Sequence, residues 1–112
     1  LQYTRGTYVC TEGPRFETRA EIKMMSMIGD IVGMTGLPEV VLARELELCY
    51  ASICTITNQA CGLTDNKITA DEVVDELGTK KDLLMNILVE IIDSLPETRE
   101  CECMNATQGA RL

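Results

Sequence analysis

The sequence predicts an α/β fold, and three observations lead to that prediction. Short β-branched and apolar runs, typical of strands, alternate with amphipathic segments of helical period. Their order of strand, helix, strand, helix, strand, helix favours a layer in which strands pair in parallel. A length of 112 residues, 46% of them hydrophobic, corresponds to one domain that can bury a core.

The first strand is expected over residues 7–10, where β-branched and aromatic residues run into a turn. A helix is expected over residues 17–28, and Gly29 ends it. Its methionine-rich face is predicted to fill the core rather than form a binding surface, because methionine adapts to irregular space. The residues on this face are Ala20, Met24, Met27 and Ile28.

The middle of the chain predicts a second strand, a short helix and a third strand. Residues 31–34 form a brief apolar run, and Pro38 then suits the first turn of a helix that runs to about Leu46. Residues 49–57 form a continuous apolar and β-branched run. That run predicts a strand covered on both of its faces.

The last predicted element is a long amphipathic helix. Thr69 and Glu72 have the spacing of a capping box at its start. Helical period then continues to Pro96, and Gly78 marks a point where the helix is expected to bend.

Composition excludes several classes of function. With 18 acidic and 10 basic residues the net charge is −8, the wrong sign for a nucleic-acid partner. The absence of His excludes an imidazole base and His-ligated zinc. Polar residues break the longest apolar stretch, so we expect no membrane span and a cytoplasmic location. The start at Leu1, without Met, is typical of a cut inside a longer protein.

The six cysteines fall into two groups. Four lie within or beside apolar segments, where we expect buried thiols that behave as small hydrophobic groups. These are Cys10, Cys49, Cys54 and Cys61. Cys101 and Cys103 lie in a polar tail, residues 99–112, that follows the domain of residues 1–98. They can form a labile disulfide or part of a soft-metal site, but two close thiols without His do not complete a zinc site.

Three polar stretches follow the predicted strands: residues 13–17, 33–36 and 57–60. In a three-layer α/β fold they would converge on one sheet edge. There they would offer an aromatic ring, a carboxylate, a carboxamide and a hydroxyl, which suit a nucleobase joined to a sugar. Each also has a structural interpretation, with Glu17 at a helix start, Thr35 as a helix cap and Asn58 in a turn. Spacing alone therefore predicts a pocket and no reaction.

Three ordered motifs resemble the purine nucleoside phosphorylase and methylthioadenosine phosphorylase family. They are Tyr-Val-Cys-Thr-Glu-Gly-Pro-Arg-Phe-Glu-Thr-Arg-Ala-Glu at 8–21, Gly-Met-Thr-Gly-Leu-Pro-Glu-Val-Val-Leu-Ala at 33–43, and Cys-Tyr-Ala-Ser-Ile at 49–53 followed by Thr57-Asn58. The resemblance implies the C-terminal portion of a three-layer fold, with helices flanking a central mixed sheet. It also implies phosphorolysis, in which phosphate releases the purine from inosine, guanosine or 5'-methylthioinosine. The other product is ribose 1-phosphate or its methylthio form, and no cofactor is involved.

The same resemblance implies a substrate site. Its substrate-binding residues are Phe16, Glu17, Met34, Asn58, Gln59 and Ala60. Phe16 would pack against the sugar or base, Met34 would contact the ribose, and Thr35 would contact phosphate through its hydroxyl and amide. Asn58 would be the catalytic residue, because it would donate to the purine as negative charge develops there.

The purine preference is predicted from Glu17, Asn58 and Ala60. Members that act on methylthioadenosine usually carry Ser in the first position and Asp in the other two. Here Glu17 can accept from the ring N–H of a 6-oxopurine, and Asn58 can donate toward its oxygen. Adenine would leave both groups mismatched, at about 1–3 kcal/mol for each unpaired group.

The resemblance also places Ala70, Val73 and Val74 near the ribose 5-position, where small and apolar side chains suit a methylthio group. Val73 is equally natural as a core position of an amphipathic helix.

Family members are more than twice as long as this chain, and they form trimers or hexamers. The N-terminal half that this chain lacks carries a phosphate-binding hydroxyl loop, an Arg–His pair and the first strands. We therefore expect the chain alone to be inactive. The alternatives are a methylthioadenosine phosphorylase of the same family and a non-catalytic purine-binding or oligomerising remnant.

Overall fold

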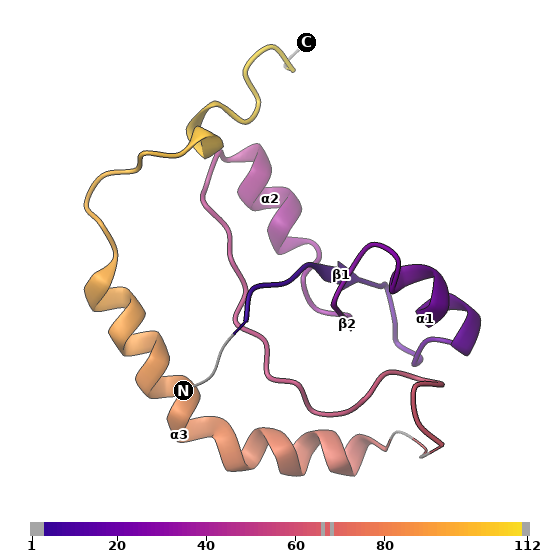
Figure 1. The fold of residues 1–112 in the computed structure, drawn as a ribbon. Coiled ribbons are helices and arrows are strands. Elements are labelled where there is room, and N and C mark those ends of the chain that lie inside the picture. The colour runs from indigo at the N-terminus through magenta and orange to yellow at the C-terminus, as the bar shows by residue number, and fades with distance from the viewer. Residues whose placement is uncertain (1–3, 66, 68, 111–112) are drawn as a thin grey trace.

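The computed structural model describes residues 4–65, 67 and 69–110. Leu1, where the sequence predicts a cut, lies outside the described residues. The described part is α/β, with a two-stranded sheet, three α-helices and a 3-10 helix. In chain order (Figure 1) the elements are β1 (Tyr8–Cys10), α1 (Arg19–Met25), β2 (Ile31–Gly33), α2 (Glu39–Glu45), α3 (Ala70–Ser94) and η1 (Glu102–Asn105).

The sheet is a parallel pair joined through α1, as the order of the elements predicts. Cys10 lies opposite Gly33, and the ladder extends by one bond because the Thr11 N–H donates to the Gly33 carbonyl at 2.8 Å. At the other end, the Thr7 N–H donates to Asp30 Oδ2 at 2.7 Å and the Asp30 N–H returns a bond to the Thr7 carbonyl at 2.9 Å. Both ends of the short sheet are therefore closed by specific hydrogen bonds.

The buried face of α1 differs from the predicted one. Ile22 and Met25 are the buried residues of this helix. Thr18 caps the helix, which therefore starts two residues later than predicted, and it ends at Met25. Met27 and Ile28 thus lie beyond the helix and cannot share its face, so the predicted face was wrong. The exposed members of that face are Ala20, Met24, Met27 and Ile28.

The predicted third strand is absent. Residues 49–57 are all described and have no regular secondary structure. A strand needs a hydrogen-bonded neighbour along at least one edge. No described backbone group from another segment forms a hydrogen bond with the backbone of residues 49–57. The side chains of Ile53 and Ile56 are 49% and 56% exposed. The prediction of a strand covered on both faces was therefore wrong for this structure.

The two later helices agree with their sequence signals. Pro38 is the N-cap of α2, and Ala43 is its buried residue. The Thr69 hydroxyl accepts from the Glu72 N–H at 3.3 Å at the start of α3. This helix changes direction along its length (Figure 1) and buries no residue. None of the described helices combines the length and the apolar run that a membrane span requires.

The chain is open rather than closed around a core. Its accessible surface is 9660 Å², against about 6,100 Å² for a compact monomer of this mass. Its radius of gyration is 16.7 Å, against about 13 Å for a compact domain. In the described part the buried apolar residues are Ile22, Met25 and Ala43. The prediction that the chain buries a sizeable core was wrong, because α3 and residues 49–57 pack against little.

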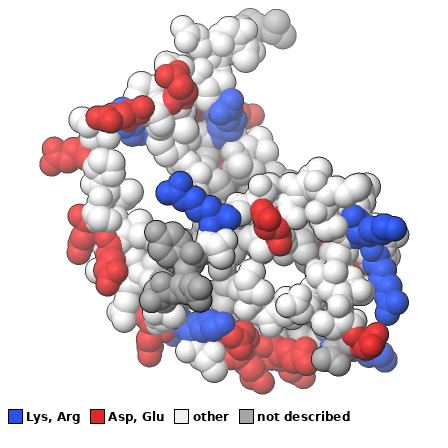
Figure 2. Space-filling model, viewed as in Figure 1, with Lys and Arg blue, Asp and Glu red and all other residues white. Residues whose placement is uncertain are grey.

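Charge on this open frame is unevenly distributed. Figure 2 shows acidic side chains gathered along the rim that α3 forms. The sequence places three carboxylates, Asp71, Glu72 and Asp75, in the first two turns of α3. Carboxylates at a helix start are favoured by the helix dipole.

The division of the chain at residue 98 stays a prediction.

Candidate functional site

The carboxyl end of the sheet holds one candidate residue, Glu17, in a defined position. The hydroxyl of Thr11, directly after β1, donates to Glu17 Oε1 at 2.6 Å. The Thr11 backbone is bonded to Gly33 at the end of β2, so the contact places Glu17 beside both strand ends. Glu17 precedes the N-cap Thr18 and bonds to Thr11, so it does not serve as a helix-start carboxylate.

The turns after the two strands lie against each other. Gly13 has a φ of +67°, and a Cβ at this position would lie 2.9 Å from the Met34 sulfur. Only glycine allows both this backbone conformation and this approach without strain. The Thr35 N–H donates to the Tyr8 hydroxyl at 3.3 Å, and the N-cap of α2 is Pro38 rather than Thr35. Two of the three predicted polar stretches are therefore brought together.

A bidentate ion pair fixes the loop between β1 and α1. Arg15 donates from Nη2 to Glu21 Oε1 at 2.7 Å and from Nη1 to Glu21 Oε2 at 2.9 Å. The Thr18 N–H and hydroxyl donate to the same carboxylate at 2.7 and 2.9 Å. The Arg15 hydrogen bonds, followed by those from Thr18, lower the pKa of Glu21 to about 2. The Phe16 ring that these contacts position is 46% exposed.

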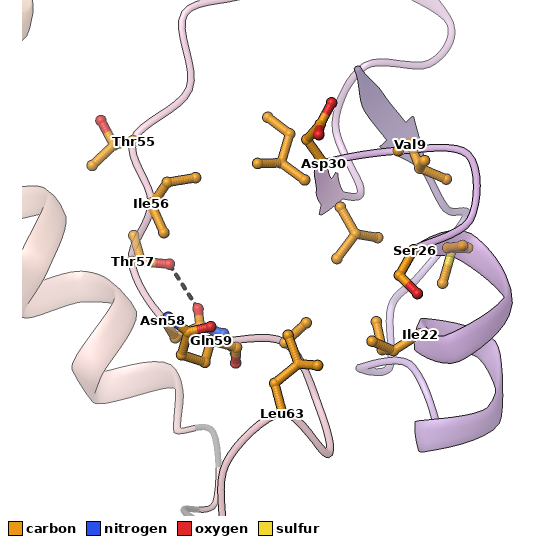
Figure 3. Close-up of a pocket in the computed structure, with 15 residues that line it drawn as sticks. Val9, Ile22, Ser26, Asp30, Thr55, Ile56, Thr57, Asn58, Gln59 and Leu63 are labelled. Atoms are coloured by element: carbon orange, nitrogen blue, oxygen red, sulfur yellow. Dashed lines mark hydrogen bonds between the residues drawn. The ribbon is translucent and has the colours of Figure 1, made fainter. Parts of the chain in front are cut away.

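The third polar stretch lines a cavity of about 360 Å³ between residues 55–60 and the sheet with α1 (Figure 3). Its lining residues are Val9, Ile22, Met25, Ser26, Gly29, Asp30, Ile31, Val32, Thr55, Ile56, Thr57, Asn58, Gln59, Ala60 and Leu63. The wall from the sheet and α1 is mostly apolar, whereas the opposite wall carries hydroxyl and carboxamide groups. This combination and size suit a small, partly polar organic molecule.

Local hydrogen bonds orient the carboxamide of Asn58 in that wall. The Thr57 hydroxyl donates to Asn58 Oδ1 at 2.7 Å, and Asn58 Nδ2 donates to the Gln59 carbonyl at 2.9 Å. One of the two Nδ2 hydrogens is thereby used, and the other remains able to serve a ligand.

The structure divides the predicted site into two parts. Asn58, Gln59 and Ala60 line the cavity. The other four members lie at the carboxyl ends of β1 and β2 and are not among its described lining residues: Phe16, Glu17, Met34 and Thr35. Glu17 therefore lines neither of the two cavities of the described part that Asn58 lines. Residues 49–57 make no ladder with β2, so nothing sets Asn58 at the edge where Glu17 lies.

A second cavity, of about 460 Å³, lies between residues 57–59 and the start of α3. Its lining residues are Thr57, Asn58, Gln59, Thr64, Lys67, Glu72, Asp75, Glu76 and Thr79. The α3 members share one helix face, and their carboxylates can accept from hydroxyl or amino groups. Ala70, Val73 and Val74 lie on the same first turns but do not line the cavity, and Val73 is half-buried.

Several residues that organise these sites were not predicted from the sequence. Thr11 orients Glu17, Tyr8 accepts from Thr35, and Asp30 both closes the sheet and lines the first cavity. A hydroxyl directly after a predicted strand was an available signal for Thr11. The partnership of Tyr8 and Thr35, 27 residues apart, had no such signal.

All six thiols are free, and the burial of several of them differs from the prediction. Cys49 and Cys54 are exposed rather than buried, while Cys10 and Cys61 are half-buried. The prediction of buried thiols was wrong for the first pair because residues 49–57 do not enter a sheet. The Cys49 sulfur instead lies 3.3 Å from that of Cys101.

The thiols of the tail titrate differently from each other. Hydrogen bonds from the Cys103 backbone and then from the Cys49 thiol lower the pKa of Cys101. The hydrogen bond to Cys101, followed by that to Cys49, raises the pKa of Cys103.

Comparison with known proteins gives a consistent result. A family model described as the phosphorylase superfamily matches residues 1–93. The chain is 59% identical over 112 residues to a protein of Methanosarcina acetivorans named "Probable S-methyl-5'-thioinosine phosphorylase", covering all of this chain and 43% of that protein. It is 51% identical over 106 residues to a "Probable 6-oxopurine nucleoside phosphorylase" of Dictyoglomus turgidum, covering 95% and 40%.

A third relative is the "6-oxopurine nucleoside phosphorylase" of Pyrococcus furiosus. It is 48% identical over 109 residues, which cover 96% of this chain and 41% of that protein. The chain thus spans less than half the length of these curated relatives.

Proposed function

We propose, on the premise that this chain belongs to the phosphorylase superfamily, that its full-length protein catalyses phosphorolysis of 6-oxopurine nucleosides. Phosphate forms a bond to the anomeric carbon of inosine, guanosine or 5'-methylthioinosine while the bond to the purine nitrogen breaks. The products are free purine and ribose 1-phosphate or methylthioribose 1-phosphate. Phosphate is a co-substrate, and the reaction needs no cofactor. The observation that carries this proposal is that relatives up to 59% identical are named for methylthioinosine or 6-oxopurine nucleosides.

The donor and acceptor groups of two residues support the purine preference. Thr11 donates to Oε1 of Glu17, and Oε2 can accept the ring N–H that hypoxanthine and guanine carry. The second Nδ2 hydrogen of Asn58 can donate to the purine as negative charge grows on the leaving base. Adenine has no ring N–H at that position and presents an amino group in place of the oxygen. Each mismatch would leave a polar group unpaired, at about 1–3 kcal/mol.

The proposal requires Asn58 and Glu17 to approach each other in the full-length protein. We infer that residues 49–57 form a strand there, within the central mixed sheet of a three-layer fold. Their apolar, β-branched composition and the exposure of Ile53 and Ile56 support this inference, because such a run gains stability when a sheet covers it. A strand beside β2 would carry Asn58 to the carboxyl edge of the sheet, where Glu17 already lies.

The large exposed surface of the chain supports the proposal that other parts of the full-length protein cover it. Exposed apolar residues along α3 include Leu77, Leu88 and Ile91, which helical period places near one face. An apolar stripe of this kind is stable when another element packs on it. We infer that the rest of the full-length protein and a homo-oligomer, a trimer or hexamer, bury this surface. A cytoplasmic location stays a prediction from the sequence.

The small number of phosphate contacts in this chain supports the proposal that the chain alone is inactive. Thr35 is the one phosphate contact that the resemblance assigns to it, and the Thr35 N–H already donates to Tyr8. A phosphate dianion is stabilised by charged donors as well as by a hydroxyl. The remaining charged groups must then come from the rest of the full-length protein.

The test is phosphate-dependent release of base by the full-length protein from inosine, methylthioinosine and methylthioadenosine. We expect both 6-oxopurine nucleosides to exceed methylthioadenosine in kcat/KM, and Asn58→Ala to reduce kcat. Glu45→Gln changes an exposed carboxylate at the end of α2 and serves as the matched control. Faster turnover of methylthioadenosine would support the adenosine-type alternative. Binding of purine without turnover would support a non-catalytic role, and either result would overturn the proposal.

A further inference from the structure

Three thiols from two distant parts of the chain meet near the C-terminus. Cys49 follows α2, whereas Cys101 and Cys103 belong to the tail and η1. All three sulfur atoms lie within 4.8 Å of one another, and those of Cys49 and Cys101 are 3.3 Å apart. The sequence alone shows only the pair in the tail, because 52 residues separate Cys49 from Cys101.

Polar contacts on both sides of the thiols hold the two segments together independently of sulfur. Before Cys101, Arg99 donates from Nη1 to the Glu47 carbonyl at 2.7 Å. After Cys103, the Thr107 hydroxyl and N–H donate to Glu47 Oε1 at 2.6 and 3.3 Å. The thiols are therefore gathered by a hydrogen-bonded clasp centred on Glu47, and a ligand that binds them need not draw the segments together first.

We propose that Cys49, Cys101 and Cys103 form a binding site for one thiophilic d10 metal ion, with Cu(I) favoured over Zn(II). Thiolate sulfur is a soft ligand that selects such ions. A metal about 2.3 Å from each of three sulfurs holds them about 4 Å apart. The observed spacing, from 3.3 Å to less than 4.8 Å, brackets that value. Binding replaces three S–H bonds by metal–sulfur bonds and releases three protons to the buffer.

The number of ligands decides between the two ions. Three thiolates complete a trigonal shell around Cu(I), whereas zinc in proteins takes four ligands and would need a water at the fourth position. Glu100 and Glu102 flank Cys101 and add negative charge that attracts a cation. The bound ion would cross-link the end of α2 to the tail.

The experiment titrates reduced protein under nitrogen with Cu(I) in competition with a chromophoric Cu(I) chelator, and with Zn(II) against a chromophoric zinc chelator. Native mass spectrometry counts the ions bound, and X-ray absorption counts the sulfur neighbours. We expect one ion per chain with three sulfurs. Zinc with three sulfurs and one oxygen would equally support a thiolate site and would reverse the order of preference.

Single substitutions separate a three-thiol site from the pair in the tail. Cys49→Ser and Cys101→Ser should each weaken binding at least about tenfold, the scale on which disturbed metal sites lose affinity. Cys54→Ser removes an exposed thiol outside the cluster and should leave binding unchanged. Circular dichroism of each variant shows whether the fold persists.

Three results would overturn the proposal. The first is reduced protein that binds no stoichiometric ion in either titration, and the second is an ion bound as tightly after Cys49→Ser. The third is a protein that forms a Cys49–Cys101 disulfide in air and, once reduced, holds no metal. In that case the 3.3 Å approach reflects a redox pair rather than a metal site.

Discussion

Removing the Thr11 hydroxyl tests how the proposed base site is positioned. In Thr11→Val the side chain keeps its shape and loses the donor that lies 2.6 Å from Glu17 Oε1. A hydrogen bond to a charged group contributes about 1.5–3 kcal/mol. Both residues are only half-buried, so we take the lower end, about 1.5 kcal/mol, which corresponds to roughly tenfold in a rate or binding constant.

The assay is kcat/KM of the full-length protein for inosine, methylthioinosine and methylthioadenosine. We expect Thr11→Val to lower kcat/KM about tenfold for the two 6-oxopurine nucleosides and to have a smaller effect on methylthioadenosine, because only the former use Glu17 as an acceptor. Thr11→Ser retains the hydroxyl and should restore most of the activity. Thr98→Val alters an exposed threonine between α3 and the tail and is the matched control.

An equal loss for all three nucleosides would show that Thr11 supports the fold rather than base recognition. Unchanged kinetics in Thr11→Val would show that Glu17 needs no orienting partner. Either result refutes the positioning argument, since that argument predicts a selective loss.

The remaining predictions concern stability. The pKa of Glu21 is lowered from 4.5 to about 2, chiefly by hydrogen bonds from Arg15, so its contribution is complete above pH 4.5 and is lost as pH falls toward 2. Thermal unfolding across that window should depend less on pH in Glu21→Gln, and an unchanged profile would contradict the assignment. Gly13→Ala should destabilise by about 1–2 kcal/mol in urea unfolding, because φ is +67° and the new Cβ would lie 2.9 Å from the Met34 sulfur. Gly78→Ala, in the interior of α3 with nothing within 4 Å of the new Cβ, should instead stabilise by up to about 1 kcal/mol, and a loss of stability there would argue against a continuous helix.

Local signals in the sequence predicted the elements whose stabilising groups are neighbours along the chain. Pro38 precedes α2, Thr69 and Glu72 bond at the start of α3, and the helix ends before Pro96. The parallel pairing of β1 and β2 was also predictable, because a helical crossover joins them. The phosphorylase motifs could likewise be recognised from the order and spacing of their residues, and the family match over residues 1–93 agrees with them.

The predictions that were wrong depended on partners distant in sequence. Residues 49–57 have the composition of a buried strand, but a strand exists only where another backbone pairs with it, and no described segment does so. The helix α1 ends at Met25, which leaves Met27 beyond it, and its buried residues are Ile22 and Met25, one turn apart. Helical period alone does not say which apolar face is buried, because that depends on the segment that packs against the helix.

By itself, the sequence determined the family, the types of the elements from β1 to α3, though not the state of residues 49–57, and the chemical groups that a purine site requires, because these follow from residue identity and short spacing. Only the tertiary structure decided which of those groups meet. It placed Glu17 with Thr11 at the sheet edge, left Asn58 across a separate cavity, and brought Cys49 to Cys101. The physical reason is that proximity between distant residues depends on the packing of whole segments, and a pattern of neighbours along the chain does not encode that packing.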